Sequence, residues 1–349
     1  MKHKFSLSSI IELKIELKTV QRKRNYISIL IIILIMAVGT KLSAQQLPIY
    51  SQYMMNGFLI NPAVAGLDGY TAINLTAREQ WLGIQDAPRT HAISLQSRIL
   101  KNSFISRNSR LRRKKRHASR SGNVGYGVYM FNDMNGLIDR TGMQGTYSYF
   151  VRMGQTHMSF GLSIMAYQFR LDRQNVHFYG DQFDELLDQN RNTLYIPDAN
   201  VGFSINNPRY HFGFSASELF KSSLQFGSIG EGEYAMIRHY NMQGGYKFGI
   251  SNYLEIEPSF LLKYPEGLAP QLDFNVKLNY MDDYWGGISF RTGNAMIIFG
   301  GLRFDKFYFG YAFDYTLNSI QKHTFGSHEI MMAVKFGDNA RRYRWLNRY

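Results

Sequence analysis

The sequence of 349 residues contains no cysteine, only eight prolines and only three tryptophans. Without cysteine, the chain forms no disulfide, no thiolate metal site and no cysteine nucleophile. Charged residues make up 19% of the chain, which is below the roughly 25% of an average soluble domain. In contrast, the chain contains 24 Tyr, 25 Phe and 31 Gly. This composition favours β-structure with closely packed backbones and aromatic surfaces.

Residues 1–44 have the pattern of a targeting segment. A basic stretch that begins at Arg22 is followed by an apolar run from Ile27 to Val38 and by the small residue Ala44, the order found in secretory signal peptides. The run is shorter than the roughly 20 residues of a membrane-spanning helix. We therefore expect cleavage before Gln45 and export of the mature protein, with a single anchoring helix as the alternative.

The formal net charge of +14 is concentrated in two regions. Residues 1–44 hold eight Lys and Arg against two acids, and residues 98–120 hold ten Lys and Arg and no acid. The remaining residues are therefore close to neutral as a group. The sequence predicts a near-neutral exported protein that carries one strongly basic loop.

Apolar and polar residues alternate from Gly69 to Phe336, which is the pattern of strands with two different faces. Residues 306–315, for example, read KFYFGYAFDY and place five aromatic rings on one face. Counting similar segments gives about 14 strands of roughly ten residues, a length that crosses a bilayer when tilted. The expected strands lie near 70–79, 90–99, 123–132, 141–151, 156–170, 199–206, 210–217, 236–248, 252–263, 272–280, 283–292, 294–304, 306–315 and 329–336.

Strands that cross a membrane must pair all their backbone groups with one another, so they have to close into a barrel. We therefore predict an all-β fold over residues 69–336, a transmembrane antiparallel β-barrel of the Gram-negative outer membrane. Its aromatic and aliphatic face would contact lipid and its polar face would line a lumen. A secreted β-sandwich or propeller also alternates, but its buried face should be aliphatic rather than rich in Tyr and Phe.

The lengths of the connections predict the orientation of the barrel. If the N-terminus lies in the periplasm, the long connections 171–198, 218–235 and 316–327 all lie outside, and turns such as NNPR at 206–209 lie inside. Short periplasmic turns and long outer loops are typical of outer-membrane barrels. The basic loop at 98–120 is the exception, because it falls among the inner connections.

Three stretches of the sequence resemble one known family. They read QLPIYSQYMMNGFLINPAVAG (46–66), AREQWLGIQDAPRTHAISLQS (77–97) and SHEIMMAVKF (327–336), and they resemble the PorP/SprF family of type IX secretion system membrane proteins. The resemblance covers residues 46–336. It implies an outer-membrane barrel of gliding or secreting bacteria that helps particular large adhesins to leave the cell. The basic 98–120 loop departs from the family, which usually has a short turn there.

The resemblance also implies that residues 50–66, YSQYMMNGFLINPAVAG, are a fixed element before the first strand. Pro and Gly interrupt any helix in this apolar stretch. Such a segment is best covered against the lumen wall or the periplasmic mouth. We predict that residues 45–68 form a plug-like segment that braces or plugs the barrel, with an ordered but functionless leader as the alternative. The residues that we expect to form it are Tyr53, Phe58, Asn61, Pro62 and Gly66.

The sequence contains no recognisable catalytic pattern. The glycines of GYGVYM (125–130) and FGGLRF (299–304) are typical of strands rather than phosphate loops, and no GxSxG or HExxH motif occurs. His323 and His328 lack the ligand spacing of a zinc site. The acidic residues of 181–190 fit either a calcium-binding or adhesin-docking patch or, as we favour, a short amphipathic loop helix. We expect no enzymatic activity, no cofactor and no metal.

The basic loop and the tail at 337–349 are the candidate docking elements, and both fall on the periplasmic side. Export argues against nucleic acid as a partner. An acidic protein partner, the anionic headgroups of the inner leaflet, or no specific role for a solvated loop are the three interpretations. The candidate partner-binding residues are Arg110, Arg112, Arg113, Lys114, Lys115 and Arg116 in the loop and Arg341 and Arg342 in the tail.

The sequence and the resemblance together predict a non-enzymatic outer-membrane component of the type IX secretion and gliding machinery. It would support the secretion and surface attachment of a cargo adhesin and would contact periplasmic and outer-membrane secretion components as well as lipid. The alternative is an outer-membrane porin or small-molecule transporter. In that case the predicted lumen residues Asp273, Lys277, Arg291 and Asp314 would set its selectivity.

Overall fold

A computed structural model of the protein describes eight stretches of the chain. Apart from residues 268–270, the described residues belong to one compact unit. Within them, no helix is long and apolar enough to cross a membrane. The described residues are 48–69, 71–99, 123–136, 138–171, 193–221, 223–225, 233–293 and 295–336.

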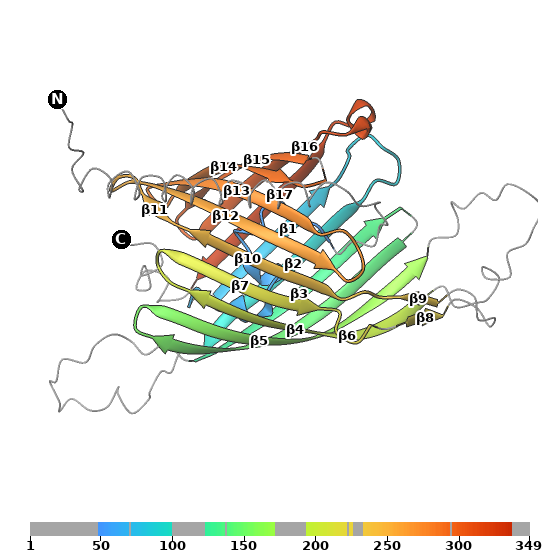
Figure 1. Ribbon diagram of the computed structural model, residues 1–349, viewed down its shortest axis with the longest axis horizontal. Helices are drawn as coiled ribbons and strands as arrows, with labels where there is room; N and C mark the ends of the chain where they lie inside the picture. Colours follow the sequence, from blue (N-terminus) through green and yellow to red (C-terminus); the bar gives the residue numbers. More distant parts are fainter. Residues whose placement is uncertain are drawn as a thin grey trace, which may run out of the picture. The chain divides into compact units, whose positions relative to one another are not determined.

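The compact unit is a closed antiparallel β-barrel (Figure 1). Its sheet has fifteen strands, of which β11 (Phe248–Gly249) is a two-residue strand beside β12, so fourteen strands form the wall. They are β1 (Thr71–Glu79), β2 (Arg89–Ile99), β3 (Val124–Asn135), β4 (Ile138–Met153), β5 (Thr156–Leu171), β6 (Thr193–Asn206), β7 (Tyr210–Ser217), β10 (His239–Tyr246), β12 (Leu254–Pro265), β13 (Gln271–Tyr280), β14 (Tyr284–Arg291), β15 (Ala295–Phe304), β16 (Phe307–Thr316) and β17 (Ser327–Phe336).

The wall closes because its first and last strands pair. Strand β1 pairs with β17 along its whole length, from Thr71 opposite Phe336 to Glu79 opposite His328. Strand β10 pairs with both β7 and β12, so the wall is continuous between them. The strands β8 (Ser223–Gln225) and β9 (Glu233–Ala235) form a separate two-stranded sheet. Closure satisfies the backbone groups of every wall strand and confirms the predicted antiparallel barrel and its strand number.

The two faces of the wall have the predicted polarity. On β13, Phe274, Val276 and Leu278 are exposed outward, whereas Asp273 and Asn275 are buried inside. At the end of the barrel where β1 begins, exposed aromatic rings form a belt of the kind that lies at a membrane surface. The belt consists of Tyr210, Tyr246, Phe248, Tyr253, Tyr280, Tyr284, Phe304 and Phe307.

Strands β4 and β6 begin earlier than the sequence predicted, at Ile138 rather than near 141 and at Thr193 rather than near 199. The sequence prediction assigned residues 171–198 to a loop and began the fourth strand only after the polar residues Asp139 and Arg140. In the structure the backbone ladder continues there, since Ile138 lies opposite Leu171 and Thr193 lies opposite Arg170. The outward residues Asp139 and Arg170 form an ion pair, with 3.3 Å between carboxylate and guanidinium. Inside the barrel at this end, apolar side chains of β3, β5 and β6 are buried together: Tyr129, Phe131, Tyr167, Phe169 and Ile196.

Candidate functional site: the occupied lumen

The lumen is occupied by the stretch that precedes β1, here called the N-terminal segment (residues 48–69). It contains the two short 3-10 helices η1 (Gly57–Leu59) and η2 (Pro62–Val64). Most of its side chains are buried against the inward face of the wall, and the ring of Phe58 is 1% exposed. The segment therefore fills space that a conducting barrel would leave to water.

At one end of the lumen, five charged side chains from five strands form a group here called the ionic clamp, made of Arg78, Asp273, Arg291, Asp314 and Glu329. Arg78 Nη2 lies 2.7 Å from Asp314 Oδ2, and its Nη1 lies 3.5 Å from Glu329 Oε2. Arg291 Nη2 lies 3.0 Å from Asp273 Oδ2, and its Nη1 lies 3.4 Å from Asp314 Oδ2. All five side chains are buried, so each charge depends on its partners.

The ionic clamp binds the start of the N-terminal segment. The backbone N–H groups of Ser51 and Gln52 donate to the two carboxylate oxygens of Glu329, at 2.6 and 2.8 Å. The Ser51 hydroxyl donates to Asp314 at 2.8 Å and accepts from Arg78 Nη1 at 2.7 Å. These bonds involve ionised groups and are stronger than neutral ones. The segment is thus part of the charge network rather than a neighbour of it.

Three side chains of the segment bond to polar groups on the wall. The hydroxyls of Tyr50 and Tyr129 lie 2.6 Å apart. The Asn56 amide donates to the Ser94 hydroxyl at 3.0 Å, and the Tyr53 hydroxyl accepts a hydrogen bond from the Asn275 amide. Because Ser94 lies on β2 and Asn275 on β13, these bonds attach the segment to opposite parts of the strand order.

Asn61 begins η2 and also ties it to the wall. Its side-chain oxygen accepts from the backbone N–H of Ala63 at 2.9 Å, which is the N-cap bond of a helix start. Its amide donates to the carbonyl oxygens of Phe203 and Phe214, at 3.0 and 3.3 Å. Pro62 occupies the first helical position, where its missing N–H costs nothing. Asn61 and Pro62 thus set this turn, as the sequence suggested.

Inward-facing glycines give the segment its room, and we call the set Gly125, Gly127, Gly161 and Gly202 the glycine seat. A Cβ added at Gly161 would overlap the backbone of Pro62 and Ala63, and one added at Gly127 would overlap the ring of Phe58. At Gly125 it would meet the carbonyl oxygen of Ala65, and at Gly202 the side chain of Asn61. The wall and the segment are therefore complementary in shape.

The segment leaves the lumen at the end opposite the ionic clamp. The Ser148 hydroxyl donates to the carbonyl oxygen of Ala65 at 2.6 Å, and the N–H of Gly66 donates to the Gln96 side chain at 3.2 Å. Gly66 has a φ of +74°, and a Cβ there would lie 2.6 Å from the carbonyl oxygen of Ser97. Glycine is required at this turn, which leads the chain into β1.

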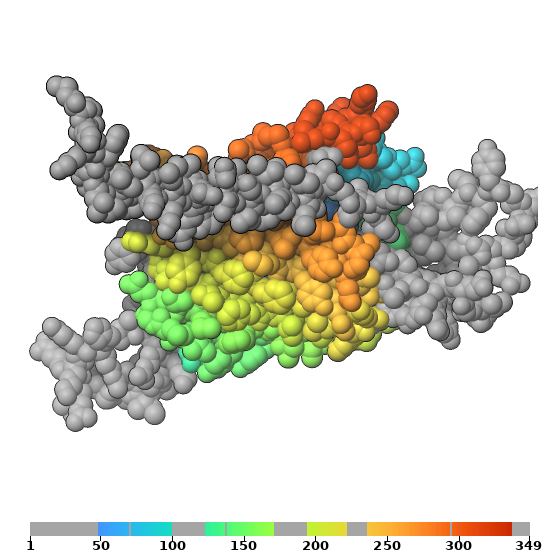
Figure 2. Space-filling model, in the orientation of Figure 1, coloured from blue at the N-terminus to red at the C-terminus, as the bar shows by residue number. Residues whose placement is uncertain are grey.

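A second feature lies at the clamp end, where residues 80–88 and 317–326 form what we call the joined outer loops. The second loop contains the 3-10 helix η3 (Ser319–His323). The N–H of Leu82 donates to the carbonyl oxygen of Gly326, and the N–H of Phe325 donates to that of Leu82, both at 2.8 Å. Trp81 holds a φ of +52°, unusual for a bulky residue. Figure 2 shows the two loops side by side in cyan and orange-red.

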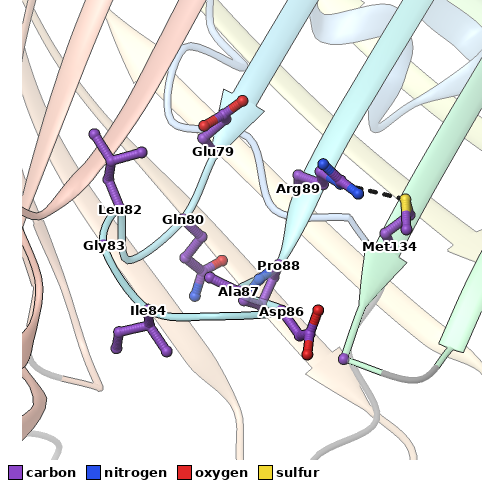
Figure 3. A pocket seen from close by; sticks show the side chains of 11 residues that line it. Glu79, Gln80, Leu82, Gly83, Ile84, Asp86, Ala87, Pro88, Arg89 and Met134 are labelled. Atoms are coloured by element: carbon purple, nitrogen blue, oxygen red, sulfur yellow. Dashed lines mark hydrogen bonds between the residues drawn. The ribbon is translucent and has the colours of Figure 1, made fainter. Parts of the chain in front are cut away.

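A small cavity of about 190 Å³ lies beside the first of these loops (Figure 3). The Arg89 guanidinium points across it to the sulfur of Met134, at 3.3 Å. Elsewhere at this end, Lys221 donates to the Glu266 carboxylate at 2.7 Å and thereby lowers the pKa of that carboxyl. The described residues bring together no group of three acidic or histidine side chains that could hold a metal ion.

The family model described as type IX secretion system membrane protein PorP/SprF matches residues 42–334. The chain belongs to this family. The PorP/SprF protein is therefore an outer-membrane component of the type IX secretion system.

None of the curated proteins matches the PorP/SprF protein in sequence. Among solved structures, it is similar to the outer membrane protein Omp33 of Acinetobacter baumannii, with 7% identity, a TM-score of 0.42 and coverage of 77% of this chain and 100% of that one. It is also similar to a FadL homologue of Pseudomonas aeruginosa, with 9% identity, a TM-score of 0.44 and coverage of 79% and 93%.

The predicted plug residues Tyr53, Phe58, Asn61, Pro62 and Gly66 are all buried in the lumen, and their role as a plug stays a prediction. The predicted partner-binding residues Arg110, Arg112, Arg113, Lys114, Lys115, Arg116, Arg341 and Arg342 lie outside the described residues, as does the acidic stretch 181–190.

Sequence reasoning missed Arg78 and Glu329 as members of the ionic clamp. It nominated Asp273, Arg291 and Asp314, but as free lumen charges of a porin. Their inward position was readable from the alternation of each strand. Their pairing was not, because it depends on which strands meet and in which register. One signal could have indicated the clamp: all five residues lie near strand ends at the same end of the barrel.

Proposed function

We propose that the PorP/SprF protein is a non-enzymatic part of the type IX secretion and gliding machinery, and that it supports the secretion and surface attachment of a cargo adhesin without conducting it through its own lumen. The observation that carries this proposal is the N-terminal segment, which is bound by the ionic clamp at one end and by Ser148 and Gln96 at the other.

Passage of a polypeptide would require the segment to leave the lumen. Its departure would remove both N–H donors from Glu329 and the hydroxyl that bridges Arg78 and Asp314. Buried charges that lose a partner are costly, typically by about 3–5 kcal/mol. The cargo therefore crosses the membrane elsewhere in the machinery, and this barrel acts by contact with the cargo and with periplasmic components.

The porin alternative loses support from the positions of its proposed selectivity residues. Asp273, Arg291 and Asp314 are engaged in the ionic clamp. Lys277 Nζ lies 2.9 Å from Glu257 Oε2, so this charge is paired as well. Side chains that are held by partners of opposite charge are poorly placed to sort passing ions.

Conductance in planar bilayers separates the two functions. We expect the full-length mature protein to be silent and a variant lacking residues 48–66 to conduct, because the deletion removes the contents of the lumen. Heat-modifiable mobility on gels would show that the shortened variant still forms a barrel. Steady ion current through the full-length protein would instead favour the porin.

The role in cargo attachment requires a separate experiment. We expect affinity capture of the tagged protein from detergent-solubilised membranes to recover a secreted adhesin together with secretion components, identified by mass spectrometry. A strain that lacks the protein should display much less of that adhesin on its surface. An unchanged amount of surface adhesin in that strain would refute the proposal.

A further inference from the structure

The N-terminal segment has a direction through the barrel. Its start, Ser51 and Gln52, is bound by residues at one end of the wall: Arg78 is the second-last residue of β1, and Glu329 is the third residue of β17. Its later part lies at the opposite end, where Ala65 reaches the wall beside Gly125, the second residue of β3. The segment thus runs the length of the lumen, antiparallel to β1.

The connections identify the two ends. At the end where β1 begins, the described turns are short and include 154–155, 207–209 and 305–306. At the clamp end they include the longer connections 80–88 and 317–326. Outer-membrane barrels keep their short turns in the periplasm and their long loops outside. The ionic clamp therefore faces the cell exterior.

We propose that the start of the N-terminal segment, at Pro48 and Ile49, forms part of the extracellular surface of the protein, although the segment joins β1 at the periplasmic end. The joined outer loops lie at the same end of the barrel, since Trp81 follows Arg78 by three residues and Ser327 precedes Glu329 by two. A protein that binds this mouth from outside touches the segment and these loops together.

Cysteine labelling tests the proposal directly, because the native chain has no cysteine to give a background. Pro48 is half-buried and lies outside the ionic clamp, so Pro48→Cys should fold. We expect a membrane-impermeant maleimide to label it on intact cells several-fold more than Lys306→Cys, which lies in an exposed inner turn. Gln85→Cys, in the exposed first outer loop, is the positive control.

A second variant, Ile49→Cys, guards against a local effect of the substitution, and heat-modifiable mobility verifies that each variant forms a barrel. Two results would overturn the proposal. The first is that Gln85→Cys reacts on intact cells while neither Pro48→Cys nor Ile49→Cys does. The second is that Lys306→Cys reacts on intact cells and Gln85→Cys does not, which would place the clamp end in the periplasm.

Discussion

Arg78 joins the ionic clamp to the N-terminal segment, since its guanidinium contacts Asp314, Glu329 and the hydroxyl of Ser51. Arg78→Met keeps the approximate length of the side chain but removes the cation that pairs with the buried Glu329 and leaves the buried Asp314 with Arg291 alone. We expect it to lower the free energy of unfolding by about 3–5 kcal/mol, measured by denaturant titration in detergent micelles.

Arg303→Met is the matched control for this change. Arg303 lies 2.6 Å from Asp283, but the Asp283 side chain is 43% exposed, so the pair is largely solvated. Exposed pairs contribute less than about 1 kcal/mol. If both variants lost the same stability, the clamp would not be a special feature of this barrel.

The glycine seat can be tested in the same way. Gly161→Leu would place a side chain where the backbone of Pro62 and Ala63 now lies, so we expect it to displace the segment and to produce ion conductance in planar bilayers. Gly145→Leu adds the same side chain on the outward face of β4, where a Cβ meets nothing within 4 Å. That control should stay silent, and a silent Gly161→Leu would show that the segment tolerates the intrusion.

For single residues, the sequence predicted which face of its strand a charged side chain occupies, but not which residue it pairs with. Alternation placed Asp273 and Asp314 inside the lumen correctly, because the two faces of a strand differ in polarity whatever the neighbours are. It did not reveal that Arg78 lies between Asp314 and Glu329, residues more than 230 positions away in the chain. Such contacts follow from closure of β1 on β17, which no local pattern encodes.

Among the elements, the strands of the wall were predicted most closely. The start of β4 was placed too late because its first residues are polar, and the start of β6 because residues 193–198 were assigned to the preceding loop. The N-terminal segment was recognised as irregular from Pro62 and Gly66. Its place in the lumen rested on the need to cover apolar surface, and its path could not be predicted because it depends on the glycine seat.

The basic loop at 98–120 is the element for which we predict a periplasmic role. Deleting it should weaken co-purification with periplasmic secretion components, because ten like charges offer a long-range attraction to an acidic partner. Barrel formation should be unaffected, because the deletion removes only Arg98 and Ile99 from the end of β2, and β2 and β3 still pair from Arg89 to Ser97. Capture that is unchanged after the deletion would count against the loop as a docking element.

For the whole molecule, the outward face of the wall dictates how the protein can be extracted. Exposed side chains such as Ile164, Ile298 and Phe274 leave an apolar surface around the barrel that only lipid or detergent can cover. We expect the protein to remain in the membrane pellet after washing with alkaline carbonate and to dissolve only in detergent. Recovery in the aqueous fraction would contradict a membrane-embedded wall.

The spread of the ionic clamp along the chain has a consequence for biogenesis. One of its residues, Arg78, is made early, whereas Arg291, Asp314 and Glu329 belong to strands that are synthesised near the end. The nascent N-terminus therefore has no completed binding site until β14, β16 and β17 have been added. Since Glu329 lies on β17, the pairing of β17 with β1 both closes the wall and completes the site that holds Ser51 and Gln52.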